Sequence, residues 1–230
     1  MVKQSCLFIF ELLKFQTFKN LKFQFVIKSE NTMIITVASF KGGQAKTTSA
    51  VHLAAFFAKR GKTLLIDGDP NRSASSWAKR KHLPFMVCDE RQAARYSREY
   101  EHIIIDTQAR PTAEDLQALA EGCDLLIIPC TPDALSLDAL FLIVEALENL
   151  GSNRFRILLT IIPPKPSRDG EEAIATLNDA GLPVFKSGIR RFVAFQKAAL
   201  HGVPVYEVSD PKAEECWQDY VNVGEEICNG

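Results

Sequence analysis

The chain of 230 residues has 47% apolar and 24% charged residues, an ordinary composition for a folded globular domain. Its length suits one domain that buries roughly 70–75% of the surface of the extended chain, so folding needs no disulfide or metal. The net charge of −1 excludes a protein that is basic as a whole, and binding to nucleic acid or to a membrane would have to come from a local patch.

Residues 1–32 differ in composition from the rest of the chain. They hold six of the fifteen phenylalanines and five lysines against two glutamates, and charges interrupt every apolar run. The segment is therefore too polar to span a bilayer, and it lacks the small-residue cleavage site of a secretory signal. Three interpretations stay open: an ordered extension, an amphipathic segment for a membrane or a partner, and a stretch encoded upstream of a start at Met33. We favour the third because the first strand begins at Met33, and we expect one domain over residues 33–230.

From Met33 onward, short apolar and β-branched runs alternate with helical patterns. Each run is apolar on both faces, which is typical of parallel strands covered by helices on both sides. This alternation predicts an α/β fold: a doubly wound, mostly parallel sheet with helices on both faces. Strands are expected at residues 34–38, 63–67, 102–106, 124–129 and 156–162, with a weaker one at 183–185. Helices are expected at residues 46–60, 72–80, 112–121, 134–149, 169–180, 192–200 and near 211–227.

Four polar stretches directly follow expected strands. In an open parallel sheet the ligand crevice lies at the carboxyl ends of the strands. We therefore expect these stretches to meet at one edge of the sheet. They are residues 39–48, 67–70, 106–111 and 130–132.

The stretch "SFKGGQAKTTSA" (39–50) has the features of a phosphate-binding loop. Gly42 and Gly43 let the backbone approach a phosphate, and the helix that follows offers unpaired N–H groups. Lys46 is expected to reach the β- and γ-phosphates, and the Thr47 hydroxyl is expected to bind Mg²⁺. Nucleotide contacts are expected along the whole loop, from Lys41, Gly42, Gly43, Gln44, Ala45, Lys46, Thr47 and Thr48.

The loop departs from the usual G-x-x-x-x-G-K-[ST] pattern at both end glycines. These positions are Phe40 and Ala45. If position 45 needs a left-handed backbone, alanine costs roughly 1–2 kcal/mol there. We therefore expect a weaker affinity for nucleotide than in loops with glycine.

Three carboxylates end two of the buried strands. Asp67 and Asp69 close "LLIDGD", and Asp106 closes "HIIID". An acidic residue at the end of a strand opposite a phosphate loop is where Mg²⁺ and its waters sit. Three such residues on one edge favour a nucleotide site over solvated turns, with Thr47, Asp67 and Asp106 as the candidate metal ligands.

With these motifs in place, residues 33–228 resemble the ParA/MinD family of P-loop ATPases with a deviant Walker box. The segment "KGGQAKTT" is similar to that family's K-G-G-x-x-K-T-T signature, "DGDP" to its second motif, and "IIIDT" to its Mg²⁺ strand. The segments "CDLLIIPCTPDALSL" and "GIRRFVAFQKAALHGVPVYE" are similar to later parts of the family. Ala45 and the segment "TQARP" (107–111) depart from the family's pattern.

The resemblance implies a Mg²⁺-dependent ATPase that works as a homodimer. Lys41 would cross the dimer interface to the partner's phosphates, so that two ATP molecules are sandwiched between the subunits. The catalytic residues would be Lys41, Lys46 and Asp69, with Asp69 orienting the attacking water and Asp67 supporting the metal shell. Turnover is expected to be slow and to be stimulated by a ParB-like or small adaptor protein.

Among the branches of this family, the sequence favours a ParA-like one that binds DNA non-specifically as an ATP dimer. The candidate DNA-binding residues are Arg190, Arg191 and Lys197, whose phosphate contacts would make binding salt-dependent. Such a protein would act on the nucleoid in the cytoplasm and would position a plasmid, a chromosome or a protein cargo.

Other branches remain as alternatives. In a MinD-like protein a basic C-terminal helix binds the membrane, but residues 207–230 carry seven acidic side chains and one lysine, so no stable membrane anchor is expected. In a nitrogenase-iron-protein-like member a cysteine follows the Mg²⁺ strand, and residues 107–122 contain none. A metabolic ATP-dependent enzyme would need a second substrate pocket. The six cysteines include no Cys-x-x-Cys pair, which indicates reduced thiols of a cytoplasmic protein.

Overall fold

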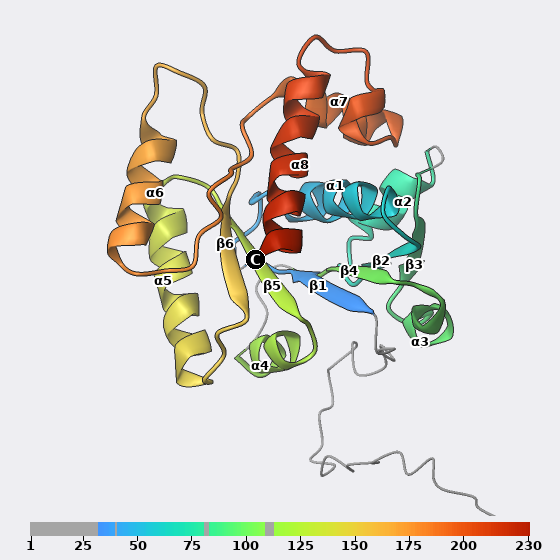
Figure 1. The fold of residues 1–230 in the computed structure, drawn as a ribbon, viewed down its shortest axis with the longest axis horizontal. Coiled ribbons are helices and arrows are strands. Elements are labelled where there is room, and N and C mark those ends of the chain that lie inside the picture. Colours follow the sequence, from blue (N-terminus) through green and yellow to red (C-terminus); the bar gives the residue numbers. More distant parts are fainter. Residues whose placement is uncertain (1–31, 40, 81–82, 109–112) are drawn as a thin grey trace, which may run out of the picture.

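A sheet of six parallel strands forms the centre of the protein (Figure 1). The computed structural model describes residues 32–39, 41–80, 83–108 and 113–230. The strand order is β3-β2-β4-β1-β5-β6, so the first strand lies in the interior of the sheet. The strands are β1 (Met33–Val37), β2 (Thr63–Asp67), β3 (Met86–Asp89), β4 (His102–Asp106), β5 (Leu125–Cys130) and β6 (Phe155–Leu159).

Helices cover both faces of this sheet, as the sequence predicts (Figure 1). Helices α1 (Lys46–Ala58), α2 (Ser73–Ala78), α7 (Val193–His201) and α8 (Ala213–Asn229) cover one face. Helices α3 (Ala93–Tyr96), α4 (Ala113–Glu121), α5 (Ala134–Asn149) and α6 (Asp169–Asp179) cover the other. Two short 3-10 helices are η1 (Ser97–Glu99) and η2 (Val205–Glu207).

Side-chain alternation along each strand builds the two cores. In β1, Ile35 and Val37 enter the core with α1 and α8, whereas Ile34 enters the core with α4 and α5. Helix α1 is buried along most of its length because it lies between the sheet and α8. The close approach of α8 depends on Gly224, since a Cβ there would lie 2.4 Å from ring atoms of Phe56.

Except at residues 183–185, the expected strands and helices are confirmed, with boundaries that differ by at most three residues. Residues 183–185 were predicted as a weak strand, but they contribute only the isolated bridge between Ile157 and Val184. The sequence prediction missed β3, a four-residue edge strand with a single buried residue, Cys88. A short edge strand that is mostly half-buried lacks the long apolar run that marks the interior strands.

The direction in which the chain leaves the sheet reverses at the carboxyl ends of β1 and β4. These strands are neighbours, but the loop after β1 leads to α1 on one face and the loop after β4 leads toward α4 on the other. Such a reversal opens a crevice at the edge of a parallel sheet. The described residues at the carboxyl ends of β1, β2, β4 and β5 meet there as expected: Lys46 contacts Asp69 and Asp106, and Gln44 contacts Thr131. Residues 40 and 109–111 of the expected stretches lie outside the described residues.

Two further expectations concern the ends of the chain. Residues 1–31 of the N-terminal segment lie outside the described residues, so the three interpretations of that segment stay open, while β1 begins at Met33 as predicted. Within the described part of the chain, no helix is both long and apolar enough to cross a membrane. The apolar face of α8 packs on α1 through Cys216, Tyr220 and Val223.

Candidate functional site

The phosphate-loop candidate connects β1 to α1 and has a left-handed backbone at two positions. Gly43 has φ 81°, and Ala45 has φ 55° and ψ 27°. Position 45 therefore has the left-handed backbone in which an alanine is strained, at a cost of roughly 1–2 kcal/mol. A Cβ added at Gly42 or Gly43 would meet nothing within 4 Å, so this side of the loop is open to a ligand.

Lys46, the first residue of α1, is brought together with two of the predicted carboxylates. Its Nζ lies 3.4 Å from Asp69 Oδ2 and 3.1 Å from Asp106 Oδ1, and the three side chains are at most 10% exposed. The half-buried Thr47 follows it on the same turn. A buried amine between two carboxylates has a partner for its charge and can exchange that partner for a phosphate.

Asp106 has the features of a metal or water ligand. Its side chain is fully buried, and its Oδ2 has no hydrogen-bond partner among the described residues. Burial raises the pKa of Asp106 from 3.8 to about 6, although the positive charge of Lys46 lowers it in part. A buried carboxylate oxygen without a partner is costly, and a cation with its waters would relieve that cost. The residues present therefore fit a magnesium ion, with Thr47 and Asp106 as the nearest donors.

Asp67 and Asp69 differ in what they touch. Both oxygens of Asp67 accept protein donors: Oδ1 accepts the N–H of Asp69 at 3.2 Å, and Oδ2 accepts the N–H and hydroxyl of Ser75 at 2.8 and 2.6 Å. Asp67 thus fixes the loop after β2 and the start of α2, and its expected place in the metal shell stays a prediction. Asp69 accepts two hydrogen bonds from Asn71 on Oδ1 and directs Oδ2 toward Lys46.

Lys41 is directed away from the Lys46 cluster, toward the start of α5. Its Nζ lies 3.3 Å from Asp133 Oδ1 and donates to Ser136 Oγ at 3.1 Å. Asp133 caps α5 by accepting the N–H of Ser136. Burial alone would raise the pKa of Asp133, but hydrogen bonds from Thr131, Ser136 and Lys41 outweigh burial and lower it to about 2.

Gln44 joins the phosphate loop to the same turn. Its Oε1 accepts the N–H and hydroxyl of Thr131 at 2.6 and 3.1 Å, and its Nε2 donates to Ser136 Oγ at 3.1 Å. The roles of Thr131, Asp133 and Ser136 were not predicted from the sequence. The available signal was the N-cap pattern of Asp133 with Ser136 three residues later.

The predicted DNA-binding residues lie apart from this crevice, on α7 and the loop before it. Arg190 binds Asp219 with its guanidinium, and these hydrogen bonds raise the pKa of Arg190. Lys197 pairs with Asp210 at 2.7 Å. Arg191 is exposed. Two of the three cations therefore have carboxylate partners within the chain, and their contact with DNA stays a prediction.

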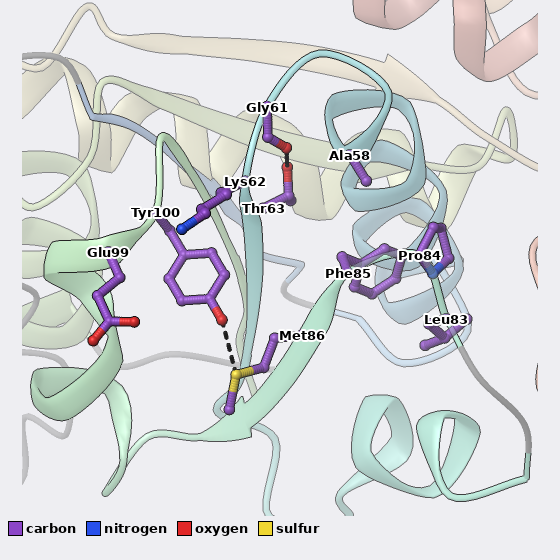
Figure 2. A pocket seen from close by; sticks show the side chains of 10 residues that line it. All are labelled: Ala58, Gly61, Lys62, Thr63, Leu83, Pro84, Phe85, Met86, Glu99 and Tyr100. Carbon is purple, nitrogen blue, oxygen red and sulfur yellow. Dashed lines mark hydrogen bonds between the residues drawn. The ribbon is translucent and has the colours of Figure 1, made fainter.

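A separate cavity of about 670 Å³ lies near the amino ends of β2 and β3, at the edge of the sheet opposite to the phosphate loop (Figure 2). Two of its lining residues are joined by a hydrogen bond, which the Tyr100 hydroxyl donates to Met86 Sδ. Among the described residues that line it, only Lys62 and Glu99 are charged. This lining does not suit a triphosphate, and we assign no ligand to the cavity.

Comparison with known proteins finds relatives over most of the chain. Residues 35–205 match the CobQ/CobB/MinD/ParA nucleotide binding domain. The chain is 33% identical over 201 residues to the maintenance of carboxysome distribution protein A of Gloeobacter kilaueensis, which covers 84% of this chain and 93% of that protein.

Solved structures share the fold at low sequence identity. A plasmid partition protein from Borrelia burgdorferi B31, bound to AMPPNP, has a TM-score of 0.68 at 19% identity and covers 86% of this chain and 99% of that one. The septum site-determining protein MinD from Pyrococcus horikoshii OT3, complexed with Mg-ADP, has a TM-score of 0.65 at 17% identity and covers 85% and 96% of the two chains. These matches confirm the α/β fold of parallel strands.

Proposed function

The chain belongs to the CobQ/CobB/MinD/ParA nucleotide-binding family, a family of P-loop ATPases, and we propose that it is an ATP-dependent dimerising switch that positions a cargo on the nucleoid. The observation that carries this proposal is the Lys46 cluster. A buried amine sits between Asp69 and Asp106 beside an open glycine loop, and one buried oxygen of Asp106 has no partner among the described residues.

Phosphoryl transfer to water needs positioning and charge neutralisation more than covalent chemistry. Lys46 exchanges its carboxylate partners for oxygens of the β- and γ-phosphates. Thr47 and Asp106 would hold Mg²⁺, Asp106 through a water. When bound, Mg²⁺ neutralises charge on the two phosphates. Asp69 accepts a hydrogen bond from the attacking water and orients it, while Asp67 keeps the loop of Asp69 in place.

Lys41 makes the switch depend on two subunits. In the single chain its amine contacts Asp133 and Ser136 at the start of α5, outside the Lys46 cluster. Its role in the proposal is to reach the phosphates of the partner subunit, so that ATP is sandwiched in a homodimer. Hydrolysis is then slow in isolation, and a ParB-like or small adaptor protein stimulates it.

The ATP dimer binds DNA without sequence preference through the region of α7. Of the three predicted cations, Arg191 is exposed, while Arg190 and Lys197 would have to exchange carboxylates for phosphates. Binding should therefore be weak and strongly salt-dependent. The likeness to a carboxysome-distribution protein supports a protein assembly as cargo, with a plasmid or chromosome as the alternative.

The test is retention of duplex DNA with ATP, with ADP and without nucleotide, repeated for Lys41→Ala. We expect retention only with ATP and loss of retention in Lys41→Ala. The matched control is Lys62→Ala, an exposed lysine at the opposite edge of the sheet, which should behave as wild type. Equal retention with ADP, or full retention by Lys41→Ala, would contradict the proposal. Binding to anionic liposomes in place of DNA would favour a MinD-like protein.

A further inference from the structure

Ala45 is the strained point of the phosphate loop. It has a left-handed backbone, where glycine is the usual residue, and it precedes α1 without a side-chain cap. The backbone at this position sets the direction of the first N–H groups of α1. A residue stays in such a conformation only if its surroundings fix it.

The residue before it is held by four hydrogen bonds. The Gln44 side chain is bonded to Thr131 and Ser136 through both its carbonyl and its amide group, and the Gln44 carbonyl oxygen accepts the hydroxyl of Thr160 at 3.2 Å. The residue is 5% exposed, so water competes little for these bonds. Gln44 is thereby fixed to the half of the sheet formed by β5 and β6.

The residue after Ala45 is fixed to the opposite half of the sheet. Lys46 reaches Asp69 after β2 and Asp106 at the end of β4. Ala45 therefore lies between two anchored neighbours, Gln44 and Lys46, and its φ and ψ angles are determined from both sides. Ala45 itself makes one further backbone contact, since its carbonyl oxygen accepts the N–H of Ser49 at 2.8 Å within α1. When Lys46 turns from the carboxylates to phosphate oxygens, the bonds of Gln44 remain as the protein's own hold on the residue before α1.

We propose that Gln44 is a positioning residue for nucleotide binding, whose side chain holds Ala45 in the left-handed conformation that directs the phosphate loop at its ligand. This inference rests on the proposed function, because it assumes that the loop binds a nucleotide. Gln44 acts through the backbone of Ala45, and its side chain, which is fully engaged with Thr131 and Ser136, does not touch the phosphates.

The experiment is a cycle of three variants: Gln44→Ala, Ala45→Gly, and both together. The affinity for Mg-ADP is measured by calorimetry, because ADP keeps dimerisation out of the result. We expect Gln44→Ala to weaken binding about 10-fold, which corresponds to about 1.4 kcal/mol. Ala45→Gly should bind as well as wild type or better. The double variant should recover most of the loss, because glycine adopts the left-handed conformation without support.

Gln117→Ala, which removes an exposed glutamine on α4, is the control and should change nothing. The free energy of unfolding without nucleotide is measured for each variant, so that general destabilisation is recognised. A Gln44→Ala variant that binds Mg-ADP like wild type would overturn the inference, and so would a double variant that binds no better than Gln44→Ala. If wild type itself fails to bind Mg-ADP, the proposed function fails instead.

Discussion

Replacing Asp133 with asparagine should strengthen the ATP-dependent dimer. In the single chain, Lys41 is paired with Asp133, and the proposed role of Lys41 in the partner's site requires that this pair breaks. Asparagine caps a helix as well as aspartate does, so α5 should keep its first turn. The substitution removes the charge that competes for Lys41. It also replaces Oδ2, which accepts the hydroxyls of Thr131 and Ser136, by an amide that donates to those hydroxyl oxygens instead.

The size of the effect follows from the exposure of the pair. The Lys41 and Asp133 side chains are 40% and 50% exposed, which puts the pair in the range of surface ion pairs, about 0.2–1 kcal/mol. A dimer breaks two such pairs, so the gain is about 0.4–2 kcal/mol. The dissociation constant of the dimer should fall about 2- to 30-fold. The gain should shrink as salt is raised, because exposed charges are screened.

Sedimentation velocity with a non-hydrolysable ATP analogue measures this constant directly. Asp138→Asn is the matched control, because it removes one negative charge from an exposed position on the same helix. An unchanged or weaker dimer in Asp133→Asn, with Asp138→Asn like wild type, would refute the reasoning. Such a result would mean that Lys41 keeps its contact with Asp133 when the subunits meet.

Three further predictions concern other parts of the structure. Burial lowers the pKa of His52 to about 4, so the folded state binds fewer protons than the unfolded state between pH 6.5 and 4. The free energy of unfolding, measured by urea titration, should therefore fall by up to about 3 kcal/mol as the pH falls through this window. The variant His52→Gln should not show this loss. Gly224→Ala should lower the free energy of unfolding by about 1–3 kcal/mol, because its Cβ would overlap the Phe56 ring, and Phe56→Leu should relieve part of that loss. Asp69→Ala should retain ATP and accumulate dimer in size-exclusion chromatography; loss of nucleotide would count against its assigned role.

The interior strands and the meeting of the carboxylates could be predicted from the sequence because both depend on short apolar runs. The runs "TLLID" and "HIIID" end in aspartates, and the parallel register places Asp67 beside Asp106. Any parallel sheet built from these two runs brings their last residues to the same edge. The meeting of the polar loops at one edge is therefore a consequence of the strand pattern, and for this reason the sequence alone predicts it.

The side-chain pairs around the loop could not be predicted in the same way. Lys41 and Asp133 are separated by 92 residues, and Gln44 and Thr131 by 87, and no local period links them. The same holds for Arg190, which the sequence presents as a cation and which the fold places against Asp219. Pairings of this kind depend on how α5 and α8 pack on the sheet, and a single sequence does not contain that information in readable form.

The anchoring of the loop bears on how the switch uses the free energy of ATP binding. Gln44 and Lys46 are already fixed by protein partners in the single chain, so a nucleotide does not have to order the loop when it binds. In the proposed function, what changes on binding is the partner of Lys46, from carboxylates to phosphates, and this exchange would leave Asp69 and Asp106 available for water and metal. Lys41 takes no part in the exchange, because its contacts lie at the start of α5. In the proposed switch, a loop fixed in advance and a lysine held at α5 would separate nucleotide capture, which one subunit can complete, from hydrolysis, which must wait for a second.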